Sequence, residues 1–467
     1  GGEDSYATFT ANRQQTEFVV DKDQLKRNSF MVKAGKKFNK FSIDANVNYI
    51  SSTIKETSSD LFFELMQTAS NIPVEKFDHG MNEHHWTVYY QSPYWKRDHI
   101  RYNTNSNTFN GILNLGYKIN KNIDVSYLAN IRVLSSDSDS HTDASKVTGY
   151  DYTNALTNAG YFYNGVQGLT FGDLGGHDVT SDYYASQYTQ RNYYGDLMFN
   201  FNYDLTDNLN LKFNIGNNIQ DVYARNTQNG GTNLDIDGWY HINNVLNPDP
   251  FRNLSNNTSR SRVVAFFGNF DFNYKDYLFL NLTGRYEQSS VLFFGGIRGT
   301  NLRNVNYEDL GTNGFPYPSV GVSFIPMKAF GMAENKVLSY AKLYANWVRV
   351  GNVNAVSAHA NDYVYGIPTG FPFGNLPAYT ANANPTSIGI EPEYVTTKEI
   401  GANLTFWEDR ISLDGSYYIQ DTKDLINRVT TSSTSGINSV LGNIGDLENK
   451  GYEVDFGLRP FKGAFQW

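Results

Sequence analysis

Apolar and polar residues alternate along most of this chain, and the segment 123–133 shows the pattern with few faults. Its apolar face holds Ile123, Val125, Tyr127, Ala129, Ile131 and Val133, and its polar face holds Asp124, Ser126, Asn130 and Arg132. A period of two places successive side chains on opposite faces of a β-strand. Asn120, Lys121 and Asn122 separate this segment from a second alternating one over 109–119. The two segments predict a β-hairpin with a tight polar turn.

The same pattern predicts about fourteen strands that fall in pairs. Their ranges are 5–17, 26–37, 41–58, 107–119, 123–136, 190–205, 209–224, 260–274, 278–292, 317–326, 337–350, 396–407, 410–426 and 451–459. Short polar turns alternate with long insertions, of which 59–106 and 143–182 are two. Outer-membrane barrels have short periplasmic turns and long extracellular loops. The rhythm therefore predicts an all-β fold: an antiparallel up-and-down transmembrane β-barrel.

The alternation also assigns the two faces of this predicted wall. The residues expected to face lipid are Leu209, Leu211, Phe213, Ile215, Val264, Phe266, Phe270, Phe272 and Tyr274. Those expected to line the lumen are Asn210, Lys212, Asn214, Asn269, Asp271 and Asn273. A soluble sheet buried on one face is the alternative, but it needs a second apolar layer that the loops do not provide. A short helix is expected within 59–69.

Composition narrows the class further. Aromatic residues reach 15% and charged residues only 18%, while the mean hydropathy is −0.49. A disordered chain would lack the aromatic residues, whereas a barrel with aromatic girdles and a wet lumen needs them. The sequence has no apolar run near the length of a transmembrane helix. A net charge of −9 argues against nucleic-acid binding. The absence of cysteine excludes disulfides, thiol catalysis and cysteine metal sites.

Several short motifs lie in one order between residues 64 and 453. The most specific is Thr-Lys-Asp-Leu at 422–425, followed by Thr-Ser-Gly at 434–436 and Asn-Ile-Gly-Asp-Leu-Glu-Asn-Lys-Gly-Tyr-Glu at 443–453. The others are Glu-Leu-Met-Gln-Thr at 64–68 with Asn-Ile-Pro at 71–73, Ser-Pro-Tyr-Trp at 92–95, Tyr-Pro-Ser-Val-Gly at 317–321, and Leu-Tyr-Ala-Asn-Trp at 343–347 with Val-Gly-Asn at 350–352. Together they resemble the SusC family (SusC/RagA), the TonB-dependent outer-membrane transporters of Bacteroidetes.

The resemblance implies a barrel of roughly 22 strands closed by a plug. We expect residues 1–467 to form part of the barrel domain, and the plug, the N-terminal extension, the TonB-contacting box and the C-terminal strands to lie outside this sequence. The implied location is the bacterial outer membrane, with lipid around the barrel. The implied partners are a SusD-like surface lipoprotein and TonB–ExbB–ExbD, with a dimer of SusCD pairs as the assembly. The implied function is active import of oligosaccharides or peptides.

Two alternatives remain open. A siderophore or cobalamin TonB-dependent receptor belongs to the same class, although the order of the motifs disfavours it. A surface adhesin or glycan-binding barrel without transport belongs to another class. No enzyme is expected, because the sequence holds no Gly-x-Ser-x-Gly elbow and no clear Ser/His/Asp or paired-carboxylate arrangement.

Candidate ligand contacts are the aromatic clusters of the long loops. These are Trp86, Tyr89, Tyr90, Tyr94 and Trp95 in one insertion and Trp239 and Tyr240 in another. Sugars stack on aromatic faces and peptides lodge between them, although such rings could instead pack their own loops or belong to the interfacial girdle.

No metal or cofactor is expected. All eight histidines fall in predicted loops, and the Glu83-His84-His85 run lacks ligand spacing. Asp137, Asp139 and Asp143 lack the glycine and the distal glutamate of a calcium loop, so they are interpreted as the polar end of a strand.

Overall fold

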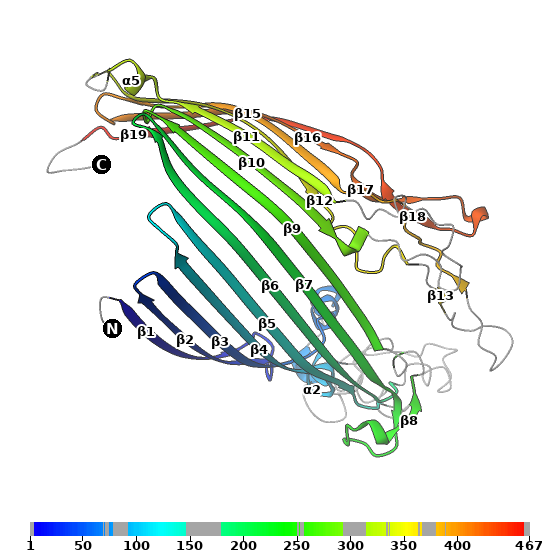
Figure 1. Cartoon of the computed structure of the whole chain (residues 1–467). Helices are drawn as coiled ribbons and strands as arrows, with labels where there is room; N and C mark the ends of the chain where they lie inside the picture. Colours follow the sequence, from blue (N-terminus) through cyan, green and yellow to red (C-terminus); the bar gives the residue numbers. More distant parts are fainter. Residues whose placement is uncertain are drawn as a thin grey trace, which may run out of the picture.

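A computed structural model of the chain describes residues 4–68, 70, 74–77, 92–145, 179–249, 252, 256–292, 314–332, 335, 337–362, 365–366, 380–387 and 389–461. The described part is dominated by one curved antiparallel sheet of long strands (Figure 1). The short turns lie at one end of these strands, and the long connections lie at the other.

Fourteen strands follow one another in sequence order across this sheet. They are β1 (Ser5–Glu17), β2 (Gln24–Phe38), β3 (Phe41–Glu56), β4 (Ile100–Lys118), β5 (Ile123–Thr142), β6 (Asp182–Thr206), β7 (Leu209–Leu234), β9 (Asn256–Tyr274), β10 (Leu278–Ser289), β11 (Phe315–Phe324), β12 (Leu338–Asn352), β15 (Glu393–Phe406), β16 (Ile411–Lys423) and β19 (Leu447–Leu458). The short strand β8 (Val245–Pro248) pairs with β7. The predicted antiparallel up-and-down wall is confirmed. Within the described residues the sheet is open, with β1 and β19 at its edges.

The predicted boundaries are wrong at the end that carries the long loops. There β4 begins at Ile100, β5 continues to Thr142, β6 begins at Asp182 and β7 continues to Leu234. These extensions are rich in Ser, Thr, Asn and Asp. They keep the hydrogen-bonded ladder but no longer have an apolar face, so hydrophobic alternation cannot reveal them. The first insertion is correspondingly shorter than predicted.

Left-handed backbone conformations form the tight turns. Lys275 and Asp276 have φ angles of 50° and 56° between β9 and β10, as a type I′ hairpin turn requires. In the turn between β4 and β5, Asn120 Oδ1 accepts hydrogen bonds from the backbone N–H groups of Asn122 and Ile123 at 2.8 and 3.0 Å. Hydrogen bonds of this kind, from the turn backbone to a side-chain oxygen, explain why Asn and Asp are common in the turns.

Short helices and two small hairpins occupy the connections. Helix α1 (Asp60–Gln67) confirms the helix expected within 59–69. Helix α2 (Pro93–His99) was not predicted, although Ser92 caps it by accepting a hydrogen bond from Trp95 N at 3.1 Å. The remaining short elements are α5 (Pro326–Ala329), η1 (Val74–Phe77), η5 (Ile242–Asn244), η6 (Ser290–Leu292), η9 (Ser433–Ser435), and the hairpins β13 (Tyr365–Gly366)–β14 (Thr380–Ala381) and β17 (Ile426–Thr430)–β18 (Ser439–Asn443).

A buried apolar cluster lies among the long connections. It consists of Val291, Leu292, Phe315, Val356, Ile390, Ile426 and Leu441. These residues come from η6, from the start of β11, from the connection between β12 and β15, and from β17 and β18. The connections on this side of the wall therefore pack against one another above the strands.

Strand register confirms the two faces. Phe213 on β7 pairs with Phe270 on β9, and their rings stack with centroids 5.4 Å apart. On the other side of β7, Phe201 of β6 stacks on Phe213 at 4.3 Å. Asn210 and Lys212 alternate with these apolar positions. Three stacked rings on neighbouring strands thus share one face, while the polar positions share the other.

Candidate functional site

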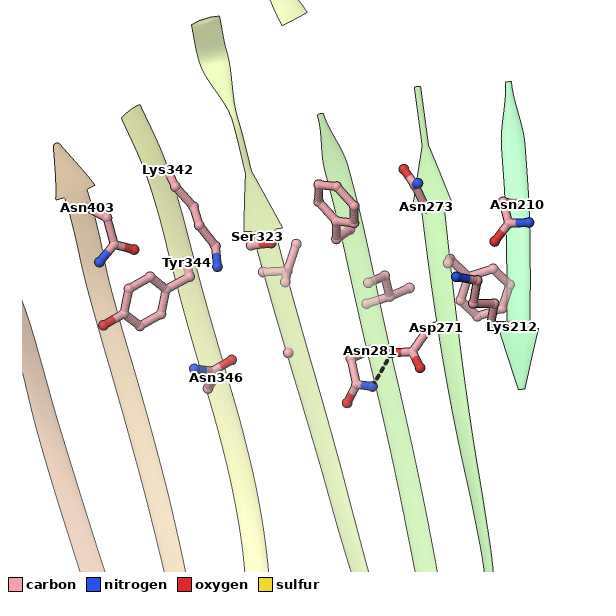
Figure 2. Close-up of a pocket in the computed structure, with 15 residues that line it drawn as sticks. Asn210, Lys212, Asp271, Asn273, Asn281, Ser323, Lys342, Tyr344, Asn346 and Asn403 are labelled. Carbon is pink, nitrogen blue, oxygen red and sulfur yellow. Dashed lines mark hydrogen bonds between the residues drawn. The ribbon is translucent and has the colours of Figure 1, made fainter. Parts of the chain in front are cut away.

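The inward face of the wall carries a hollow of about 700 Å³ near the tight turns, lined by both polar and apolar residues. Figure 2 shows its side chains on six neighbouring strands, β7, β9, β10, β11, β12 and β15. The labelled residues are Asn210, Lys212, Asp271, Asn273, Asn281, Ser323, Lys342, Tyr344, Asn346 and Asn403. The side chain of Asn281 donates to Asp271 Oδ1 at 2.5 Å and to Asn269 Oδ1 at 2.8 Å. This part of the wall is therefore an ordered array of amides and charges that water or a polar solute can contact.

Tyrosines on the inward face lie flat over glycines of the neighbouring strand. Tyr344 pairs with Gly401 and Tyr418 pairs with Gly451, and in each case a Cβ on the glycine would overlap the tyrosine ring. The hydroxyl of Tyr344 donates to Glu399 Oε1 at 3.2 Å. Glycine thus keeps these rings against the wall and out of the lumen, as in the aromatic rescue of sheet glycines.

A smaller hollow of about 250 Å³ lies on the inward face where the strands leave the membrane toward the long loops. Glu56, Tyr102 and Tyr184 occupy one row of the register on β3, β4 and β6. The guanidinium of Arg252 lies over the Tyr184 ring, 3.9 Å from its centroid. Two aromatic faces, a cation and a carboxylate thus line one opening. None of these four residues was among the contacts predicted from the sequence. A search for tyrosines along the polar strand extensions could have found Tyr102 and Tyr184.

The predicted aromatic contacts in the first long insertion divide into two groups. Trp86, Tyr89 and Tyr90 lie outside the described residues. Tyr94 and Trp95 lie on α2, where Trp95 is only 1% exposed and stacks on His99 with centroids 5.1 Å apart. Tyr94 is half-buried beneath the guanidinium of Arg97. The described geometry therefore gives Trp95 a packing role within its loop, and ligand contact by Tyr94 stays a prediction.

Trp239 and Tyr240 lie in the connection that follows β7. Trp239 is 47% exposed and stacks on His241. The Tyr240 hydroxyl donates to Asp143 Oδ1 at 2.5 Å, and its ring stacks on His141. His141 lies in β5, so the expectation that every histidine falls in a loop is wrong. It occupies the same face of β5 as Ile123 and therefore belongs to the lipid-facing side, beyond the apolar band. Tyr240 thus packs against the outer side of the rim. Ligand contact by Trp239 and Tyr240 stays a prediction.

Asp143 joins three elements at this rim. His99 Nδ1 on α2 lies 2.7 Å from its second oxygen. Burial raises the pKa of Asp143, but the hydrogen bonds from His99 and Tyr240 outweigh it and hold the pKa below its ordinary value. Burial and the neighbouring carboxylate both raise the pKa of Tyr240. The pair therefore remains a neutral phenol donating to a carboxylate over the physiological range.

Among the described residues, no three His, Asp or Glu side chains are grouped to hold a metal ion. Asp137 and Asp139 lie in β5, which confirms their interpretation as part of a polar strand end. His84 and His85 lie outside the described residues. No helix in the described ranges is both long and apolar enough to cross a membrane.

A wall of long antiparallel strands, apolar outside and polar inside, defines an outer-membrane β-barrel protein. The chain matches the family model described as "TonB dependent receptor-like, beta-barrel" over residues 26–467. It belongs to that family, as a SusC-like member located in the bacterial outer membrane. TonB-dependent receptor P26 of Formosa agariphila is 28% identical over 236 residues, which cover 48% of this chain and 21% of the relative.

Solved structures share the fold. The RagAB peptide transporter aligns with a TM-score of 0.67 at 13% identity, over 98% of this chain and 47% of the other. The open-open state of the RagAB peptide importer gives 0.70 at 12% identity, over 99% and 47%. The ferric-catecholate import receptor Fiu from K12 E. coli gives 0.51 at 11% identity, over 98% and 59%. The chain thus spans about half the length of these structures and about a fifth of the relative P26.

Proposed function

We propose that this chain is the barrel wall of a SusC-type transporter that imports oligomeric nutrients, either glycans or peptides, across the outer membrane. The observation that carries the proposal is the chemical division of the wall, with stacked aromatic rings outside and an amide- and charge-rich surface inside. A purely adhesive barrel has no need of a polar inner surface that extends from the tight turns to the long loops. A SusC-type lumen uses such a surface to hold a plug and to pass polar cargo.

The smaller hollow of about 250 Å³, near the long loops, supports an oligomeric polar substrate. The ring of Tyr102 offers a face on which sugars or peptide side chains stack, and the ring of Tyr184 supports the guanidinium of Arg252. Arg252 and Glu56 provide a donor and an acceptor beside them, which suits hydroxyl groups or the charged ends of a peptide. We assign first contact with substrate to these residues and retain Trp86, Tyr89, Tyr90, Tyr94, Trp239 and Tyr240 as further contacts on the loops.

The packed connections beyond β10–β16 support a lid partner. Their apolar cluster includes Val356, Ile390 and Leu441 and gives this side of the rim a preformed shape. We place a SusD-like surface lipoprotein on it and assign the opening of the plug to TonB–ExbB–ExbD through other parts of the protein. A dimer of SusCD pairs belongs to the same proposal.

Uptake by the full-length protein tests the proposal. Cells would be given labelled oligosaccharides or labelled peptides, with and without a proton-motive force. We expect energy-dependent uptake of one class and none after removal of the TonB contact. Tyr102→Ala should weaken uptake of that class roughly threefold to tenfold, as expected for loss of an aromatic contact. Tyr184→Ala should weaken it as well, because it removes the ring that supports Arg252. Tyr127→Phe, on the outward face, is the matched control. Unchanged uptake without TonB would reject active transport.

A further inference from the structure

The outward apolar face ends at the same level on two neighbouring strands, β7 and β9. It runs from Leu209 to Ile219 on β7, and the register places Tyr274 and Val264 of β9 beside these two residues. At 3.4 Å per residue and a tilt of about 40°, this stretch rises roughly 26 Å, which matches the apolar band of an outer-membrane barrel. The next outward position on β7 is Asp221. It therefore lies at the interface with the outer leaflet.

Three arginines lie close to Asp221 on this outward face. Register places Tyr193, Asp221 and Arg262 in one row of β6, β7 and β9, and places Arg191, Tyr223 and Arg260 in the next row. Arg225 lies one row farther from the band. Rows on one face are about 7 Å apart and strands about 4.8 Å apart. Arg191, Arg260 and Arg262 thus lie within about one row of Asp221, and we call these three residues the arginine cluster. Arg225 reaches away from it, toward Asn256.

Asp221 orients two members of the arginine cluster without covering them. Arg260 Nη2 and Arg262 Nη2 lie 2.7 and 2.5 Å from Asp221 Oδ2. Their side chains are nevertheless 57% and 52% exposed, whereas that of Asp221 is 13% exposed. The carboxylate therefore fixes the guanidinium groups from beneath and leaves their outer N–H groups open to a ligand.

Positive charge remains after this pairing. The cluster has three arginines beside one carboxylate, Asp221, so the net charge of this group is +2. Arg191 and Arg225 are exposed and form no ion pair with any residue that the structure describes. Arg225 Nε donates to Asn256 Oδ1 at 2.9 Å, a neutral partner. Asp137 is the next outward-facing carboxylate on β5. It lies four residues closer to the long loops than the β5 residue that pairs with Arg191.

We propose that the arginine cluster binds the phosphate groups of a phosphorylated glycolipid in the outer leaflet. Guanidinium groups match phosphate oxygens in bidentate geometry. A lipid is favoured over a soluble anion because the cluster directly adjoins the apolar band, where Ile219 and Val264 would contact acyl chains. Tyr193 and Tyr223 lie among the arginines, at the level where amphipathic rings meet headgroups. A ligand with an anionic headgroup and apolar acyl chains can bind the arginine cluster and the adjoining apolar band at the same time.

The test uses the full-length protein in nanodiscs and two probes, phosphorylated glycolipid from the outer membrane of the source bacterium and the same lipid after phosphatase treatment. Bound lipid would be measured by native mass spectrometry. The wild type should retain the phosphorylated form preferentially. The double variant Arg260→Gln/Arg262→Gln should bind it at least about tenfold more weakly, since two charge-assisted hydrogen-bonding groups are lost.

Three single variants separate binding from folding. Arg191→Gln breaks no ion pair within the described structure and should still weaken binding severalfold. Asp221→Asn keeps every arginine but removes the carboxylate that orients two of them, so it should weaken binding less than the double variant does. Lys121→Gln removes an exposed charge in the tight turn between β4 and β5, at the other end of the strands, and should change nothing. Equal retention of the dephosphorylated lipid, displacement by millimolar inorganic phosphate, or equal losses in Lys121→Gln and Arg191→Gln would overturn the proposal.

Discussion

The Tyr240 hydroxyl donates a 2.5 Å hydrogen bond to Asp143, although 97 residues separate the two in sequence. This contact fastens the connection after β7 to the end of β5. It also joins that connection to α2, because Asp143 contacts His99 as well. The outer rim of the mouth is thus held by a small polar network above the membrane.

Tyr240→Phe should loosen this rim without unfolding the wall. Loss of a hydrogen bond to a carboxylate costs about 1.5–3 kcal/mol, and the cost should be confined to the connection that holds Tyr240. Hydrogen exchange should therefore quicken over residues 235–244 and stay unchanged in β5 and β7. Trp239→Phe is the matched control, because the Trp239 ring is exposed and stacks on its neighbour His241. Equal acceleration in both variants would contradict the role of the Tyr240 hydroxyl.

Asp98 should make the attachment of α2 sensitive to acid. Burial raises its pKa, but hydrogen bonds from Arg97 and Lys22 outweigh burial and lower the pKa to about 2. Because the folded pKa lies below the unfolded one, the stabilisation is complete above about pH 4. It is lost as the pH falls toward 2.

Thermal unfolding in detergent measures this linkage. The melting temperature of wild type should exceed that of Asp98→Asn at pH 7, and the gap should close as the pH approaches 2. Asp60→Asn, at an exposed position on α1, is the control and should give a smaller gap at pH 7. A gap that is independent of pH would show that the Asp98 charge is not the cause.

Gly401→Ala should destabilise the wall through Tyr344. The new methyl group overlaps the ring that lies across Gly401, and overpacking of this kind costs about 1–3 kcal/mol. Gly415→Ala is the matched control, since nothing lies within 4 Å of a Cβ there. Denaturant unfolding would measure both variants. Adding Tyr344→Ala to Gly401→Ala should recover part of the loss, and a purely additive double variant would contradict the overlap.

Phe213→Arg should be far more costly than Asn214→Arg. Phe213 lies near the middle of the apolar band and is stacked between Phe201 and Phe270. An arginine on the lipid face at the bilayer midplane costs about 2–4 kcal/mol. Asn214 is next in sequence but faces the lumen, where the same charge stays hydrated. Refolding into lipid vesicles would measure both costs, and equal values would contradict the assigned faces.

The polar strand extensions and the mouth show where sequence reasoning stopped. Alternation located strands only where one face was apolar, so it missed the first residues of β4 and β6. Tyr102 and Tyr184 lie in these missed segments, and their pairing depends on a register that continues well beyond the membrane. Helix α2 was also missed, because its seven residues carry no helical hydrophobic period and depend on the Ser92 cap and on tertiary packing around Trp95.

The sequence by itself determined the class of the fold, the order of the strands and the two faces of the wall. A period of two is local, and it is enforced wherever one face meets lipid and the other meets water. The tertiary structure decided which distant residues meet. Tyr240 and Asp143, the row of Glu56, Tyr102 and Tyr184, and the arginines around Asp221 depend on strand register and loop packing. These are long-range relationships that a local hydrophobic pattern does not encode.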